Sequence, residues 1–192
     1  MEYVYGVVEA AGNDCVLGTL QNVERQYEFD KGVSRKKDFP ADAFYRMSDE
    51  YPDNLVLGDV LDNTNDLLVV SQRFLDLLSE EDFKNNEVLP VKIMNHKDRF
   101  EEKQYFILNQ LEHQDLIDRD QSELEVNDID PEKIVTIYDL VLDESKIDNS
   151  VSILRMTGFS QVLVLRRDLA DRIEKSGIKG IEVNEFDDWD VI

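Results

Sequence analysis

Acidic side chains that could do chemistry crowd one stretch of this sequence, from Glu112 to Asp148. The stretch holds thirteen carboxylates against three basic residues. Carboxylates can ligate a hard cation, act as acid and base, or face a positively charged surface of another protein. The candidates for contact with a basic partner are Asp115, Asp118, Asp120, Glu123, Glu125, Asp128 and Asp130. A solvated acidic loop without any ligand is the alternative.

The spacing of these carboxylates does not favour a calcium site. The run from Asp118 begins like a calcium-binding loop, with oxygen-bearing side chains at alternate positions. Glu123 stands where such a loop needs glycine, and Ile129 stands where it ends on a glutamate. We therefore expect no metal there. The segment from Asp128 to Pro131 is typical of a capped turn or a helix start.

Other catalytic and cofactor sites find little support in the sequence. His96 and His113 are the only histidines, and we expect both at the surface. Cys15 is the only cysteine, and we expect a small buried side chain. Phosphate-binding, dinucleotide-binding and nucleophile-elbow motifs are missing. We predict a protein that is not an enzyme and needs no cofactor; a small metal-dependent or carboxylate-based hydrolase is the alternative.

The net charge restricts the partners of this chain. Its 192 residues include 43 acidic and 21 basic side chains, which gives −22. Repulsion between carboxylates and phosphates argues against nucleic acid or an anionic membrane surface as a ligand, whereas a basic protein would be attracted. Solubility alone is the other explanation. No export signal and no long apolar run is found, so we expect a cytoplasmic protein.

The residues that must position these groups show two similar patterns. Leu67–Val70 reads as a strand, Ser71 as a helix N-cap, and Phe74, Leu77 and Leu78 as one helix face. A second apolar strand follows at 88–93. Pro90 within it suggests a strand at the edge of a sheet or the end of a strand.

The second pattern lies near the C-terminus. Val162–Leu165 is a strand, Leu169 and Ile173 share a helix face, and Gly177 ends the helix before a strand at Ile181–Val183. Val70, Phe74 and Leu78 align with Leu165, Leu169 and Ile173. We interpret this as a strand–helix–strand duplication, with chance similarity as the alternative.

The sequence predicts further strands at 104–109 and 134–138, so the expected strands outnumber the expected helices. We predict an α+β fold with a mixed, mostly antiparallel sheet and short helices, in one domain over residues 1–192. Residues 1–60 look irregular and β-rich, with two or three short strands, a turn at 11–14 and a solvated basic loop at Arg35–Lys37.

Ordered blocks across residues 61–192 resemble immunity protein family eleven of bacterial polymorphic toxin systems. The blocks are Leu68–Leu78, Glu87–Val91, Tyr105–Asn109, Asp115–Glu123, Leu140–Ile147 and Val162–Val183. The resemblance extends over about two thirds of the chain. The resemblance implies a protein encoded beside a secreted toxin, which it binds and neutralises.

The acidity adds an expectation to this resemblance. A nuclease toxin fits best, because its active site must be basic to hold phosphates. We expect stoichiometric occlusion of a toxin domain with a basic active site, through the seven carboxylates named above. The acidic C-terminal segment holds the only tryptophan, Trp189, which we expect to pack over a sheet edge rather than to anchor a partner.

Overall fold

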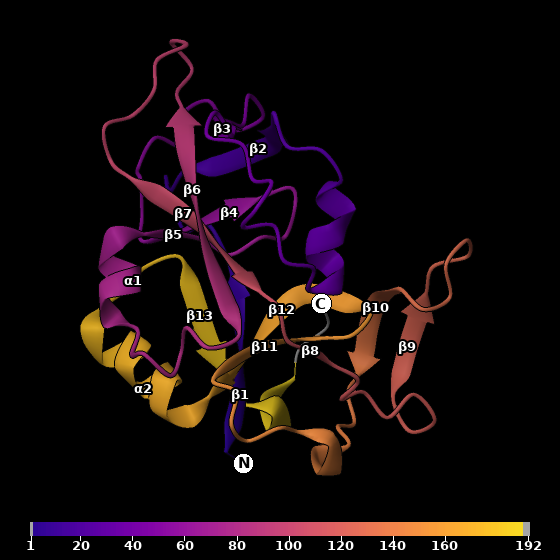
Figure 1. Cartoon of the computed structure of the whole chain (residues 1–192). Coiled ribbons are helices and arrows are strands. Elements are labelled where there is room, and N and C mark those ends of the chain that lie inside the picture. The colour runs from indigo at the N-terminus through magenta and orange to yellow at the C-terminus, as the bar shows by residue number, and fades with distance from the viewer. Residues whose placement is uncertain (1, 190–192) are drawn as a thin grey trace.

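The computed structural model describes residues 2–189 and shows two β-rich lobes with a projecting hairpin (Figure 1). One lobe is a closed six-stranded barrel and the other is a five-stranded sheet. The fold is sheet-rich with few short helices, so the α+β prediction is confirmed. None of the helices within 2–189 is long and apolar enough to span a membrane.

The barrel was not predicted. Its strands follow one another in the order β2 (Val16–Gln21), β3 (Phe44–Met47), β6 (Asn86–Met94), β7 (Tyr105–Gln110), β5 (Val69–Ser71) and β4 (Val60–Asn63). The pairs β2–β4 and β3–β6 are parallel, and the others are antiparallel. Leu17, Tyr45, Ile93 and Ile107 fill its interior. Pro90 lies where β6 pairs with β7 alone, because the pairing with β3 begins at Lys92.

The five-stranded sheet joins the two ends of the chain. Its order is β13 (Ile181–Asn184), β1 (Tyr3–Val8), β12 (Phe159–Arg166), β11 (Ile153–Met156) and β8 (His113–Gln114). All its pairs are antiparallel except β11–β8. The strands predicted at 162–165 and 181–183 are confirmed, and β1 lies between them.

Two α-helices pack where the barrel meets the sheet. They are α1 (Gln72–Leu77) and α2 (Arg167–Ser176), and three short 3-10 turns complete the helical content: η1 (Gln26–Lys31), η2 (Glu144–Lys146) and η3 (Phe186–Asp188). The Ser71 hydroxyl accepts from the Phe74 amide at 3.3 Å, and Gly177 ends α2 with φ 68°. Both signals were predicted, and Phe74 and Leu169 share one core.

The two strand–helix–strand units have the same local topology. Strands β5 and β6 flank β7, and β12 and β13 flank β1, with the flanking strands antiparallel to the central one in each case. The helices α1 and α2 contact each other. This agreement is compatible with a duplication, which stays a prediction.

The N-terminal part is more ordered than its sequence suggests. Strands β1, β2 and β3 lie before residue 60, and the turn at 11–14 is closed by the Asp14 amide, which donates to the Ala11 carbonyl at 3.0 Å. The prediction of a solvated basic loop is wrong at Arg35, because this residue is only 2% exposed. Its guanidinium pairs with Asp38 at 3.3 Å and stacks on Phe29.

Candidate functional site

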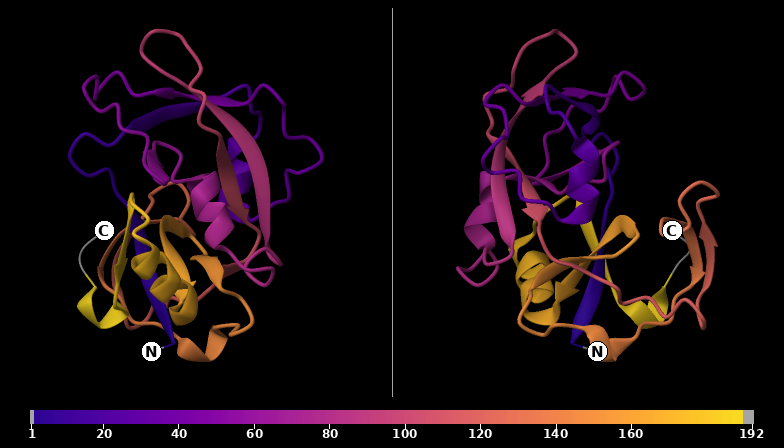
Figure 2. Two further views of the ribbon diagram at one scale, coloured as in Figure 1. Left: turned by 90° about the vertical axis from the view of Figure 1, so that its left-hand side faces the viewer. Right: turned by 45° about the vertical axis from the view of Figure 1, so that its right-hand side comes forward.

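A two-stranded hairpin stands apart from both lobes. Strands β9 (Glu123–Val126) and β10 (Ile134–Asp139) form their own antiparallel sheet, and we call residues 123–139 the arm. The arm projects at the right of Figure 1 and rises beside the barrel in the right-hand view of Figure 2. Its inward residues Ile134 and Ile137 are buried in a core with the five-stranded sheet.

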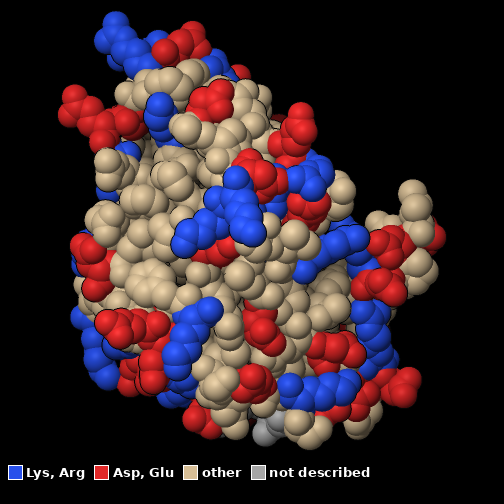
Figure 3. Space-filling view, in the orientation of Figure 1, with Lys and Arg blue, Asp and Glu red and all other residues tan. Residues whose placement is uncertain are grey.

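The structure spreads the seven predicted acidic residues over the arm and the segment before it. Glu123 and Glu125 lie on β9, and Asp128 and Asp130 lie in the arm's turn. Asp115 and Asp120 precede the arm, and all six of these side chains are exposed. In Figure 3 the projecting arm shows acidic and uncharged atoms, whereas the rest of that face mixes both charges. The predicted carboxylates therefore lie on the projecting arm and on the segment before it.

Asp118 differs from the other six because it shapes a turn. Its carboxylate is half-buried and accepts from the backbone amides of Asp120 at 3.1 Å and Gln121 at 3.2 Å. The hydrogen bond from the Gln121 side chain, with these amides, lowers the pKa of Asp118. A carboxylate with this many local partners is less available to another protein than its exposed neighbours.

The arm also exposes apolar side chains, which the sequence analysis missed. Val126, Val135 and Tyr138 are exposed on its strands, and Ile129 at its tip is 94% exposed. Ile129 stands between Asp128 and Asp130. An apolar residue within a charged rim is typical of a protein contact. The sequence signal was the isoleucine itself, in a turn where polar residues prevail.

Local hydrogen bonds hold the tip of the arm in one shape. The Asn127 side chain accepts from the amides of Ile129 at 2.9 Å and Asp130 at 3.0 Å. The Asp130 carboxylate accepts from the Glu132 amide at 3.3 Å. The predicted capped turn is confirmed, with Asn127 as the capping residue. Such pre-organisation reduces the entropy lost on binding.

The base of the arm is fastened to the sheet. Arg119 donates to the Glu132 carbonyl at 2.9 Å, and the Ile134 amide donates to the Gly158 carbonyl at 2.8 Å. Gly158 has φ 82°, and a side chain there would collide with the Glu132 carbonyl. Trp189 packs on Tyr5 of β1 and Phe159 of β12, so it lies on inner strands of the sheet and not over the predicted edge. The arm is therefore presented on a fixed base.

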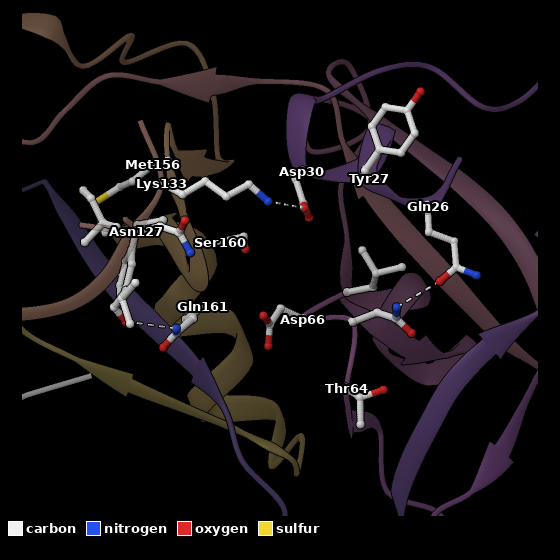
Figure 4. A pocket seen from close by; sticks show the side chains of 16 residues that line it. Gln26, Tyr27, Asp30, Thr64, Asp66, Asn127, Lys133, Met156, Ser160 and Gln161 are labelled. Carbon is white, nitrogen blue, oxygen red and sulfur yellow. Dashed lines mark hydrogen bonds and ion pairs between the residues drawn. The ribbon is translucent and has the colours of Figure 1, made fainter. Parts of the chain in front are cut away.

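A cleft of about 540 Å³ separates the arm from the barrel. Its walls include Asp30 of η1, Asp66 of the turn between β4 and β5, Ser160 of β12 and Lys133 of the arm. Figure 4 shows Lys133 reaching across to Asp30, with 3.5 Å between the charged atoms. None of the seven predicted carboxylates lines this cleft.

Asp66 is the residue of the cleft that sequence reasoning missed. Its backbone is left-handed, with φ 52°, and its side chain points into the space between the walls (Figure 4). Arg155, which is buried, donates to the Asp66 carbonyl at 2.6 Å. Desolvation by the walls raises the pKa of Asp66, although Arg155 acts in the opposite direction.

The histidines and the cysteine do not assemble a catalytic group. Both His96 and His113 are half-buried, so the expected surface positions are wrong; desolvation lowers the pKa of His113. Cys15 is buried as predicted, and burial raises its pKa to about 12. Within residues 2–189, His, Cys, Asp and Glu side chains do not form a group of three that could hold a metal ion.

A comparison with models of protein families finds a match over most of the chain. Residues 18–188 match the model of an immunity protein family, Imm11. No curated protein matches the chain. The matched range includes the arm, the cleft between arm and barrel, most of the five-stranded sheet and all of the barrel strands except the first two residues of β2.

Proposed function

The chain belongs to the Imm11 family of immunity proteins, and from this membership we propose that it binds and neutralises one cognate bacterial toxin by stoichiometric occlusion. The proposal assigns binding, rather than catalysis, to the surface described above. One observation carries it: the arm presents Ile129, 94% exposed, within a rim of carboxylates on a fixed base.

The composition of the arm supports a basic partner. Five of the seven predicted carboxylates lie on the arm or in the turn at 118–122 with free access to solvent, namely Asp120, Glu123, Glu125, Asp128 and Asp130. Opposed charge accelerates association, and desolvated apolar anchors slow dissociation. A standard interface of roughly 800 Å² per partner extends beyond the arm alone. We propose that the arm is its centre and that neighbouring surfaces form the rim.

A nuclease is the class of toxin that we propose. Its active site has to be basic because it holds phosphates, and an acidic convex arm is complementary in both charge and shape to such a groove. We place the encounter in the cytoplasm, where nucleic acid is the target. The barnase–barstar and colicin nuclease pairs are known examples in which a nuclease is bound by its inhibitor with very high affinity through such complementarity.

The arrangement of the acidic residues favours a binding protein over a small hydrolase. Paired carboxylates that act as acid and base must converge on one substrate. Six of the seven predicted carboxylates are instead exposed along the arm and the segment before it, and none of the seven lines the cleft. The hydrolase alternative therefore has less support than toxin binding.

The deciding experiment is growth rescue followed by isolation of the complex. Cells express the toxin domain encoded beside this chain, with the chain, without it, or with a variant that carries Asp120→Lys, Glu123→Lys and Asp128→Lys. Rescue by the wild-type chain, with a one-to-one complex in light scattering, is the expected result. Growth arrest despite abundant folded protein, together with no complex, would contradict the proposal.

A further inference from the structure

We propose that the cleft between the arm and the barrel receives an arginine or lysine side chain of the bound toxin, with the Asp66 carboxylate as its acceptor. This inference rests on the proposed function and adds a second, concave contact to the convex arm. It assigns a role to residues outside the acidic stretch.

The cleft has the size and the composition of a binding site. Its volume of about 540 Å³ lies within the range of ligand pockets. Polar side chains line it from both lobes, with Gln26 and Asn65 on the barrel side and Asn127 and Gln161 on the other. An incoming side chain and the backbone that carries it could form hydrogen bonds with both walls.

The backbone at Asp66 is held in a conformation that aims the carboxylate into the cleft. Left-handed φ values are uncommon for residues other than glycine and occur where the surroundings enforce them. Here the Arg155 guanidinium donates to the Asp66 carbonyl at 2.6 Å and to Gln110 at 2.9 Å. The buried arginine therefore fixes the turn from behind, while the carboxylate faces the cleft.

The Asp66 carboxylate is the free acceptor of this cleft. No hydrogen bond or ion pair to its oxygens is found among residues 2–189, whereas the other carboxylate, Asp30, pairs with Lys133 at 3.5 Å. The Arg155 guanidinium donates its hydrogen bonds to Gln110 and to the backbone carbonyls of Asp66 and Ser160, so its charge acts on the Asp66 carboxylate without a direct hydrogen bond. Arg155 does not line the cleft. A cationic side chain of the toxin would supply the ion-pair partner that the Asp66 carboxylate lacks among residues 2–189.

A structural role for Asp66 makes a different prediction from a binding role. Burial lowers the pKa of Arg155 to about 10, and among the acidic groups Asp66 opposes this fall most strongly. If that were its only role, Asp66→Asn would reduce stability and leave the toxin affinity of the folded protein unchanged. If the cleft receives a cation, the affinity falls while the protein stays folded.

The test measures binding of the full chain to the toxin domain encoded beside it, by calorimetry. Asn also tolerates the left-handed conformation, so Asp66→Asn should fold. We expect its affinity to fall by about tenfold or more. Asp53→Asn is the matched control, because this exposed carboxylate lies outside the cleft and its loss removes the same charge. We expect the control to change the affinity by less than about twofold.

A double-mutant cycle completes the test. Each Lys and Arg of the toxin's contact surface is replaced by Met and measured against both wild type and Asp66→Asn. One of them should show strong coupling to Asp66. Equal affinity of Asp66→Asn and wild type, or the absence of any coupled cation, would overturn the inference while the proposed function stands. Failure of the wild-type chain to bind the toxin would overturn both.

Discussion

The indole nitrogen of Trp189 donates a hydrogen bond to the backbone carbonyl of Ile137, with 3.1 Å between the two atoms. The ring also lies 4.8 Å from that of Tyr5, centroid to centroid. Trp189 therefore connects β10 of the arm to β1 of the five-stranded sheet. This contact makes the orientation of the arm depend on the C-terminal segment of the described chain.

Replacement of Trp189 should loosen the arm. Trp189→Ala removes the ring and its hydrogen bond, and we expect a loss of about 2 kcal/mol in the free energy of unfolding, because the side chain is only partly buried. Trp189→Phe keeps most of the packing and should cost about 1 kcal/mol. Urea unfolding followed by circular dichroism gives these values. Hydrogen exchange at 134–139 should accelerate in Trp189→Ala; unchanged exchange there would show that other contacts hold the arm.

Ile129 should matter for binding and not for stability. Because its side chain is 94% exposed, Ile129→Ser should change the free energy of unfolding by less than about 0.5 kcal/mol. In complex with the toxin domain, the same change should weaken binding by about tenfold or more. Leu55→Ser is the control, since Leu55 is an exposed apolar residue outside the arm. Similar affinities of the two variants would place the apolar anchor elsewhere.

The exposed carboxylates of the arm should govern the association rate. Reversal of Asp120, Glu123 and Asp128 to Lys should slow association about tenfold or more at low salt and flatten its dependence on salt concentration. Asp118 is left intact, because its turn would be disturbed. Stopped-flow mixing at several salt concentrations measures this effect.

The control for that triple variant carries the same change of charge in another region. Glu50, Asp53 and Glu80 are exposed and lie outside the arm. Their reversal to Lys changes the net charge by the same amount. If both triple variants slow association equally, the effect comes from overall charge, and the arm has no special role in steering.

His113 should make stability fall as the solution becomes mildly acidic. Desolvation, with the nearby Arg155 charge, lowers the pKa of His113 in the folded protein below its value of 6.5 in an unfolded chain. Between these two pKa values the unfolded state binds more protons, so acidification favours unfolding. The loss of stability between pH 7.5 and 5.5 should be smaller in His113→Gln than in wild type. The same loss in His113→Gln and in wild type would contradict the assignment to His113.

Signals between residues close in sequence predicted the helices well. The cap at Ser71 involves an amide three residues away, and Gly177 acts on its own backbone, so neither depends on the rest of the fold. The barrel gave no such signal. Its closure needs β2 beside β4 and β3 beside β6, and the residues of those pairs are separated by more than forty positions, for example Tyr45 and Ile93.

The sequence predicted which residue types the candidate site contains, but it did not predict how they are arranged in space. The acidic run indicated exposed carboxylates, and the structure places most of them on the arm or next to it. Asp66 could not be found in the same way, because its orientation depends on Arg155, which is 89 residues distant in sequence. Arg35 was misjudged for a similar reason: its burial against Phe29 depends on a turn that the basic run does not reveal.

The position of β1 between β12 and β13 has a consequence for synthesis of the protein. The barrel can begin with β2, and all six of its strands lie before residue 111. Strand β1, however, lacks both of its pairing strands until residues 159–184 have been translated. Such pairing between distant segments slows folding. A newly made copy should therefore become protective only after these late segments, and Trp189 behind them, have been translated. Cells would then depend on copies finished before the toxin arrives.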